Sequence, residues 1–215
     1  MSAGGLEGLC GGKIHLVEHR QQLLQAEMKA RKIPALAVAI ARRDRLVYDD
    51  AFGVIDLENA VPAKPSTRFR LASLAKPMTA VAVMQLVEKG KIALDAGIHE
   101  YVPAFPAKPV KVTVRQLLGH LGGIRHYDRA RGEMESTRHY NDVVAALEIF
   151  AADPLVHPPG SKYLYTTYGY NLLGAAVQEV ADIPYVDYVR QNILAPGRLR
   201  DEMGLRAIKP PGEYP

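Results

Sequence analysis

Hydrophobic and polar positions follow two different periods along the chain. In residues 35–41, ALAVAIA, every second residue is a large apolar one and the residues between are alanines, which is the period of a β-strand. The turn RRD and the stretch RLVYDDAFG follow, so residues 35–53 predict a β-hairpin. Most of the remaining sequence repeats its apolar positions every three to four residues, which is the helical period.

The predicted elements define an α+β chain. Residues 1–13 are rich in glycine, and we expect them to be disordered. The predicted helices cover residues 14–32, 77–87, 113–121, 141–153, 168–184 and 185–197. Because two strands alone form a marginal sheet, this inventory lacks the further strands that would complete it.

The stretch FRLASLAKPMTAVAVMQLVEKG, residues 69–90, places a charge where the pattern predicts burial. Its second half is apolar on nearly every side, which is typical of a buried helix, but Lys76 lies in the first turn, one turn after Ser73. In one interpretation Ser73 caps the helix and the Lys76 side chain extends to water. In the other, a desolvated neutral lysine accepts the proton of Ser73 and makes its hydroxyl a nucleophile.

Two later stretches, LLGHLGGIRHY and YLYTTYGYNLLGAAV, extend this pattern. With the S-x-x-K of Ser73 and Lys76, they make the sequence resemble the β-lactamase-related serine hydrolases: class C β-lactamases, penicillin-binding proteins, DD-peptidases, related esterases and a mitochondrial branch. In that family the tyrosine motif reads Y-S-N-x-G-Y-x-L-L-G, and Tyr165 falls on its catalytic tyrosine. The motifs occur in the family's order and spacing, which makes the resemblance specific.

The resemblance implies a β-lactamase/transpeptidase-like fold, with an N-terminal β-hairpin followed by an inserted helical domain. Residues 14–215 would form the N-terminal part of a β-lactamase-related domain that includes both. The resemblance also implies an acyl-enzyme on Ser73, with Lys76 as base and Tyr165 as proton relay. A third family motif, a Lys- or His-Thr/Ser-Gly strand, is not recognisable. We therefore expect the C-terminal sheet strands and one oxyanion donor to be missing, and the 215 residues alone to be inactive.

The implied substrate is a small molecule or peptide, with a peptide or amide bond first and an ester or a β-lactam as the alternative. Thr167 stands where the family has asparagine, and its hydroxyl can contact Lys76 or a substrate carbonyl with shorter reach and one donor fewer. β-Lactam turnover is therefore a weaker expectation than acyl transfer in general. A non-catalytic binding or scaffold protein with an intact pocket floor is the alternative from another class.

Composition narrows the other functional classes. The net charge of +4 is modest and the basic residues are scattered, which argues against a dedicated nucleic-acid surface. The apolar runs are too short for a membrane span, and no signal peptide is recognisable, so the cytoplasm is the default location. Cys10 is the only cysteine, which excludes a disulfide framework, and we expect no cofactor.

The histidines offer one metal-like motif and one loop residue. HLVEH, from His15 to His19, matches the inverted zinc motif H-x-x-E-H, but no downstream acidic ligand is recognisable, so a solvent-facing helix is the better interpretation. His120 resembles the histidine of a family loop, which implies that it fixes the loop rather than acting as a base. For His126, His139 and His157 we predict no role.

Overall fold

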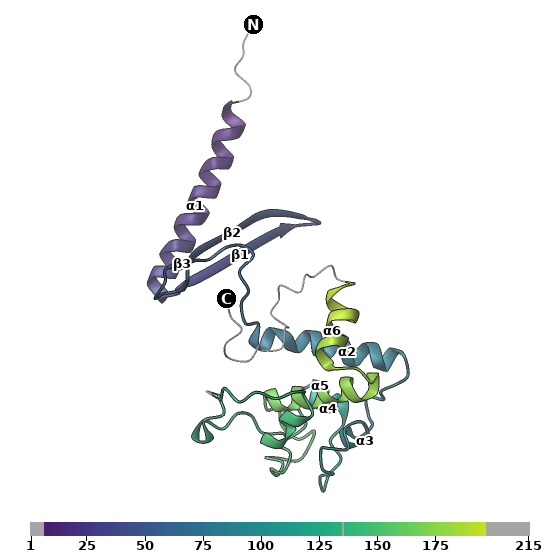
Figure 1. Cartoon of the computed structure of the whole chain (residues 1–215). Helices are drawn as coiled ribbons and strands as arrows, with labels where there is room; N and C mark the ends of the chain where they lie inside the picture. The colour runs from purple at the N-terminus through teal and green to yellow at the C-terminus, as the bar shows by residue number, and fades with distance from the viewer. Residues whose placement is uncertain (1–6, 135, 197–215) are drawn as a thin grey trace. The chain divides into compact units, whose positions relative to one another are not determined.

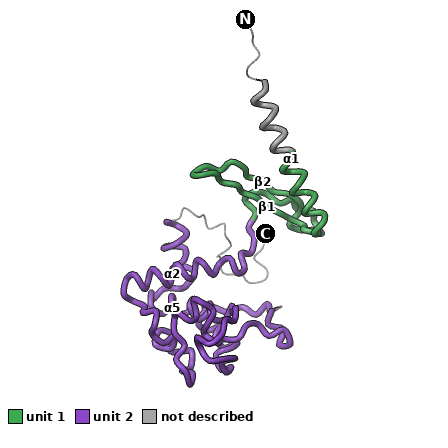
Figure 2. The backbone as a smooth tube through the Cα atoms, turned by 180° about the vertical axis from the view of Figure 1, so that it is seen from behind, with its two compact units in different colours: residues 1–67 green, residues 68–215 purple. Residues whose placement is uncertain are grey.

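The computed structural model describes residues 7–134 and 136–196, and the chain divides into two compact units (Figure 2). Unit 1 is residues 1–67 and unit 2 is residues 68–215. The boundary falls in the polar connector between the hairpin and the helical region. The single domain predicted over residues 14–215 stays a prediction, because a division by packing does not test a family boundary.

Unit 1 consists of one helix and a three-stranded antiparallel sheet (Figure 1). Its elements are α1 Glu7–Arg31, β1 Ala35–Arg42, β2 Arg45–Asp56 and β3 Val61–Pro62, with the strands in the order β1-β2-β3. The predicted hairpin is confirmed: Ala35 pairs with Gly53, and the register shifts between Ile40 and Ala41. Strand β3 is not predicted, because two residues are too few to set an alternating pattern.

Helix α1 is tied to the rest of unit 1 by specific contacts. Met28 is buried, and Gln21 Nε2 donates a hydrogen bond to Asp50 Oδ2 on β2 at 3.1 Å. Gly53 takes a φ of 79°, and a Cβ at this position would lie 2.1 Å from the carbonyl oxygen of Pro34. Helix α1 begins at Glu7, within the stretch predicted to be disordered, which corrects that boundary: helix ends are poorly determined by a local pattern.

Unit 2 is built of short helices and turns that pack around two longer helices. Its elements are η1 Ala72–Ala75, α2 Lys76–Glu88, α3 Ile98–Tyr101, α4 Val114–Leu118, η2 Arg129–Arg131, η3 Ala145–Ile149, α5 Thr167–Ala181, α6 Tyr185–Val189 and η4 Arg190–Leu194. Helix α5 packs against α2, α3, α4, α6 and η3, and Figure 1 shows it among the other helices. Its fully buried residues Leu172, Leu173 and Val177 belong to the hydrophobic core of the unit.

The starts of α4 and α5 agree with the sequence pattern. Thr113 caps α4, as predicted: its hydroxyl accepts the N–H of Gln116 at 3.2 Å, and the Gln116 side chain accepts the N–H of Thr113 at 2.9 Å. Helix α5 occupies most of the predicted range 168–184. The helix predicted over residues 185–197 is shorter, because α6 gives way to the π-helical turn η4.

The helix predicted over residues 141–153 is wrong, since only the 3-10 turn η3 forms there. Side chains from elsewhere in unit 2 bind the backbone carbonyls at its end. Arg125 Nη2 donates to the carbonyl of Ile149 at 3.0 Å, and Lys108 Nζ donates to that of Ala151 at 2.6 Å. These tertiary bonds replace the intrahelical bonds that local spacing predicts.

Helix α2 is buried on one face and not all round, which corrects the prediction from its apolar sequence. The buried residues are Thr79, Ala82, Val83 and Leu86. On the other side, Val81 and Met84 are 48% and 45% exposed. The buried face packs against α5 and fixes the direction of α2, and with it the position of the residues at its N-terminus.

We expect Leu86→Ala to lower the free energy of unfolding by about 2–5 kcal/mol, because it leaves a cavity in the face that packs in the core. Met84→Ala is the matched control on the exposed face, and we expect a change within about 0.5 kcal/mol. Urea unfolding of the two variants, followed by helical circular dichroism, measures both. Equal losses would show that the exposed face of α2 is covered in solution.

Candidate active site

Ser73 lies in η1, the 3-10 turn that leads directly into α2. The preceding residue, Ala72, has a φ of 46°, a left-handed conformation that is uncommon for a residue with a side chain. No side chain caps η1 or α2, so the capping interpretation of Ser73 is wrong. Lys76 Nζ instead donates a hydrogen bond to Ser73 Oγ at 3.1 Å. The S-x-x-K spacing therefore corresponds to a direct contact between the two side chains.

The N-terminus of α5 brings the second pair of predicted residues to this point. Tyr165 lies just before the helix, and its hydroxyl donates to Ser73 Oγ at 2.7 Å. Thr167 is the first residue of α5, and its Oγ1 accepts a hydrogen bond from Lys76 Nζ at 3.3 Å. All four side chains singled out in the sequence thus form one cluster, although they come from two distant segments of the chain.

The charge of Lys76 dominates the electrostatics of this cluster. Its Nζ lies 4.8 Å from the centroid of the Tyr165 ring. Hydrogen bonding to Lys76, then hydrogen bonding to Ser73 and the positive charge of Lys76, lower the pKa of Tyr165 below its ordinary value of 10.0 against the opposing effect of burial. Among the ion pairs found in the described residues, none involves Lys76. The cluster therefore favours an anionic form of a neighbouring oxygen.

Two histidines that line the Tyr165 segment hold its backbone. The N–H of Thr166 donates to His120 Nδ1 at 3.3 Å, and the N–H of Thr167 donates to His126 Nδ1 at 3.2 Å. The contact of His120 agrees with the loop-fixing role that the resemblance implies. The contact of His126 is missed by sequence reasoning, because its partner lies 41 residues further along the chain and shares no motif with it.

Behind the cluster, Arg125 forms a nearly buried ion-pair network. Its guanidinium makes a bidentate contact with Glu133 at 2.8 and 2.9 Å and a further contact with Asp153 at 2.5 Å. The Tyr168 hydroxyl donates to Glu133 at 2.7 Å. These contacts raise the pKa of Arg125 and lower that of Glu133 to about 2, in both cases chiefly through their mutual hydrogen bonds. The network joins the loop after α4 to helix α5.

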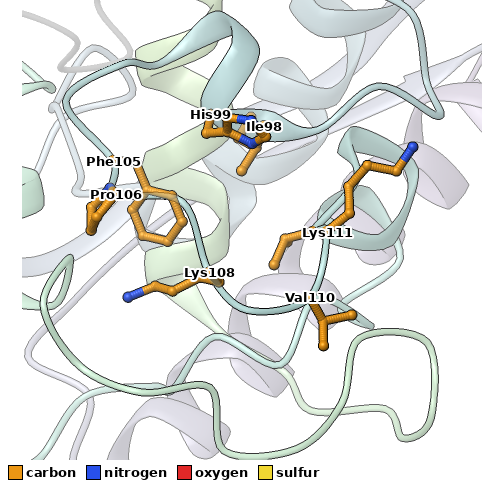
Figure 3. Close-up of a pocket in the computed structure, with 8 residues that line it drawn as sticks. Ile98, His99, Phe105, Pro106, Lys108, Val110 and Lys111 are labelled. Atoms are coloured by element: carbon orange, nitrogen blue, oxygen red, sulfur yellow. The ribbon is translucent and has the colours of Figure 1, made fainter.

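A pocket whose lining shares no residue with this cluster carries different chemistry (Figure 3). Its volume is about 230 Å³, much of it open to solvent, and its lining includes Phe105, Lys108 and Lys111. The lining residues carry no hydroxyl, thiol or carboxylate. Lys108 is already bound to the carbonyls of Ala151 and Asp153, at 2.6 and 2.8 Å. We therefore place the candidate active site at Ser73 and not in this pocket.

The metal-like motif HLVEH stays a matter of sequence, because most of its side chains lie outside the described residues. Among the side chains that the structure describes, His, Cys, Asp and Glu nowhere gather in a group that could hold a metal ion. The side chains of His15 and Glu18, two of the three ligand-type residues of the HLVEH motif, lie outside the described residues. None of the helices described for this chain combines enough residues with enough hydropathy to span a bilayer.

A serine hydroxyl contacted by both a lysine and a tyrosine is the side-chain cluster expected of the S-x-x-K class of serine hydrolases, and the same chain also contains a small antiparallel sheet. A family model described as Beta-lactamase matches residues 20–214, and the chain belongs to that family. The β-lactamase/transpeptidase-like fold predicted from the motifs is thereby confirmed.

Known relatives cover most of this chain. The mitochondrial serine beta-lactamase-like protein LACTB of Homo sapiens is 28% identical over 81% of this chain and 44% of its own length. The octameric penicillin-binding protein homologue from Pyrococcus abyssi is 29% identical, with a TM-score of 0.72 over 84% of this chain and 42% of its own. EstCE1, described as a hydrolase with promiscuous acyltransferase activity, is 27% identical, with a TM-score of 0.73 over 86% of this chain and 52% of its own. The chain thus spans about half the length of these relatives.

We expect Glu133→Gln to lower the free energy of unfolding by about 3 kcal/mol, because it leaves the nearly buried Arg125 without its bidentate partner. The matched control is Glu148→Gln, which removes an exposed pair with Arg138 and should cost much less. Urea unfolding at pH 7 compares the two variants.

The pH dependence gives a second readout of this pair. The pKa of Glu133 is about 2 in the fold against an ordinary 4.5, so its contribution is complete above pH 4.5 and is lost as the pH falls towards 2. In Glu133→Gln this part of the acid destabilisation should be absent. An unchanged acid profile would contradict the assignment of the network to Glu133.

Proposed function

We propose that this chain carries the nucleophile and proton-transfer groups of a serine hydrolase that works through an acyl-enzyme on Ser73. The observation that supports the proposal is the convergence of Lys76 Nζ and the Tyr165 hydroxyl on Ser73 Oγ, at 3.1 and 2.7 Å. A hydroxyl with two such neighbours has a proton acceptor within reach and needs no rearrangement to react.

In the acylation step, Ser73 Oγ attacks the carbonyl carbon of the substrate while its proton passes to Lys76 in the unprotonated form. The bond between the carbonyl carbon and the leaving nitrogen or oxygen then breaks. Tyr165 donates its proton to the leaving group and recovers one from Lys76, so the groups return to their starting protonation state. The backbone N–H of Ser73, near the start of the helical turn, is a candidate donor to the developing oxyanion.

In the deacylation step, water attacks the ester formed on Ser73. The same two groups act in reverse: one accepts the proton of the water and the other returns a proton to Ser73 Oγ. We assign Thr167 a substrate-binding role, because its hydroxyl lies beside Lys76 and accepts a hydrogen bond from it. Both Ser73 and Tyr165 are exposed, so a substrate can approach the reacting oxygen from solvent.

The substrate class that we propose is a peptide or amide, with an ester as the alternative. An amide agrees with the similarity to the D-amino acid amidase from Ochrobactrum anthropi, which is 25% identical with a TM-score of 0.67, and an ester or acyl-transfer substrate agrees with the similarity to EstCE1. Amide cleavage needs protonation of the leaving nitrogen, which is the task assigned to Tyr165. The contact of Lys76 with a threonine in place of the family's asparagine makes a β-lactam the weakest of these substrates.

The first test is covalent labelling of Ser73. A fluorophosphonate or a penicillin, incubated with the longest form of the protein that contains these residues, should add mass to the peptide with Ser73. Ser73→Ala should abolish the adduct with unchanged circular dichroism. An adduct that persists in the variant would exclude Ser73 as the nucleophile, and no adduct on any form would favour a non-catalytic binding protein.

The second test separates a base from a mere positive charge. Guanidinium does not give up its proton, so Lys76→Arg should lose acylation almost as completely as Lys76→Ala. Acylation is measured as the rate at which the adduct on Ser73 forms. If Lys76→Arg keeps more than about a tenth of the rate, a loss below about 1.4 kcal/mol, the lysine acts by charge alone and Tyr165 is the base. Tyr165→Phe then has to abolish acylation.

A further inference from the structure

The two backbone N–H groups that flank the start of α5 have side-chain acceptors. The donors are the N–H groups of Thr166, the N-cap residue, and Thr167, the first helical residue. Their acceptors are His120 Nδ1 at 3.3 Å and His126 Nδ1 at 3.2 Å. Since an N–H group can only donate, each Nδ1 atom must present a lone pair. Both imidazoles are therefore neutral here, with their proton on Nε2.

The same two rings contact the ring of Tyr165. The His120 ring centroid lies 4.6 Å from that of Tyr165, and the His126 centroid lies 5.7 Å from it in an edge-on arrangement. On the two sides of Tyr165, the N–H of Leu164 donates to the carbonyl of His120 at 2.9 Å and Thr166 Oγ1 donates to that of Arg125 at 2.6 Å. The tyrosine thus sits on a segment held on both sides by the loop after α4.

His120 is held in place by its backbone as well as by its ring. Its φ of 57° is left-handed, which turns the chain sharply after α4. Its ring also lies 5.0 Å from that of Tyr170 and 5.8 Å from that of Tyr163. A residue in this conformation that also packs among three tyrosine rings has little freedom to reorient, so its Nδ1 atom is a fixed acceptor.

The groups that face the two rings disfavour a positive charge on them. These groups are Lys76, His126, Tyr163, Tyr165 and Tyr170 around His120, and Lys76, His120, Tyr127 and Tyr165 around His126. Burial first, and the charge of Lys76 second, lower the pKa of both imidazoles below the ordinary value of 6.5. Neither ring has a carboxylate among these neighbours that would stabilise its protonated form.

We propose that His120 and His126 are positioning residues: their neutral Nδ1 atoms hold the Thr166 and Thr167 N–H groups and thereby place the Tyr165 hydroxyl on Ser73 Oγ. The proposal rests on the proposed function in that it assigns Tyr165 a catalytic position. Protonation of either ring turns its Nδ1 acceptor into an N–H donor. This donor then faces the backbone N–H of Thr166 or Thr167, and the hydrogen bond is lost. The segment then loses its anchor, and Tyr165 leaves the position in which it contacts the nucleophile.

This arrangement predicts that the site loses activity at acid pH. Above the lowered pKa of the two imidazoles both N–H bonds are intact, and they break as the pH falls through it. Folding stability follows the same sign. In the unfolded chain the two imidazoles take up a proton at about pH 6.5, whereas in the folded chain their pKa is lower. The free energy of unfolding therefore falls as the pH drops below about 6.5.

Asparagine is the variant that separates position from charge. Its side-chain oxygen can accept the same N–H bond but cannot be protonated in this pH range. It also tolerates a left-handed backbone, which suits position 120. In the longest form of the protein, we therefore expect His120→Asn and His126→Asn to retain most of the wild-type rate at which a fluorophosphonate labels Ser73 near neutral pH, and to shift the acid limb of its pH profile to lower pH. Alanine at either position removes the acceptor and should reduce this labelling rate by about 10²-fold.

The matched control is His139→Asn, since His139 is an exposed histidine of the same unit. It should leave both the rate and the acid limb unchanged. If the asparagine variants lose as much activity as the alanine variants, or if their acid limb stays where it is in the wild type, the positioning role is wrong.

A readout independent of catalysis keeps the proposal separate from the proposed function. Nitrogen-15 NMR of the imidazoles at neutral pH should show both histidines with the proton on Nε2. Amide hydrogen exchange at Thr166 and Thr167 should accelerate in the alanine variants and not in the asparagine ones. A proton on Nδ1, or unaltered exchange in the alanine variants, would overturn the proposal even in an active enzyme. Inactivity with the expected tautomers and exchange would refute only the hydrolase function.

Discussion

The geometry of the site depends on one ammonium group that bonds to two helical segments at once. Lys76 Nζ donates to Ser73 Oγ at the start of α2 and to Thr167 Oγ1 at the start of α5. Both helices contribute their N-termini, where the helix dipole favours negative charge. The lysine charge adds to that field instead of being neutralised by a carboxylate. The packing of α2 against α5 keeps these two N-termini together.

The support for α5 comes mainly from residues that carry no chemistry of their own. Glu133 and Asp153 neutralise the guanidinium of Arg125. The backbone carbonyl of Arg125 accepts a hydrogen bond from the hydroxyl of Thr166. Tyr168, the second residue of α5, joins the network from the helix side through its hydrogen bond to Glu133. A buried ion pair contributes little net stability on balance, but removing one partner is costly. Its value here is therefore geometric: it fixes the loop that carries His126 to the helix that carries Thr167.

The sequence reveals the residues of the site whose relation is local or belongs to a motif, and misses the ones whose relation is only tertiary. Ser73 and Lys76 are one helical turn apart, and Tyr165 and Thr167 follow from a motif in the family's order. By contrast, the contact between His126 and Thr167 depends on a loop conformation that no spacing encodes. The one-sided burial of α2 escapes prediction for a related reason, because an apolar residue such as Val81 can be exposed without changing the helical pattern.

The identity of the base follows from how the protons are shared. Lys76 Nζ and the Tyr165 hydroxyl both lie within hydrogen-bond distance of Ser73 Oγ, at 3.1 and 2.7 Å, so the ionisation of Tyr165 is coupled to these two neighbours. Removing one proton from this group of side chains leaves either a neutral lysine beside a phenol or an ammonium beside a phenolate. The lowered pKa of Tyr165 makes the second state more accessible than it is for a free tyrosine. Both states present a proton acceptor to Ser73 Oγ, and only a chain in which lysine and tyrosine keep these positions can exchange one for the other without moving a heavy atom.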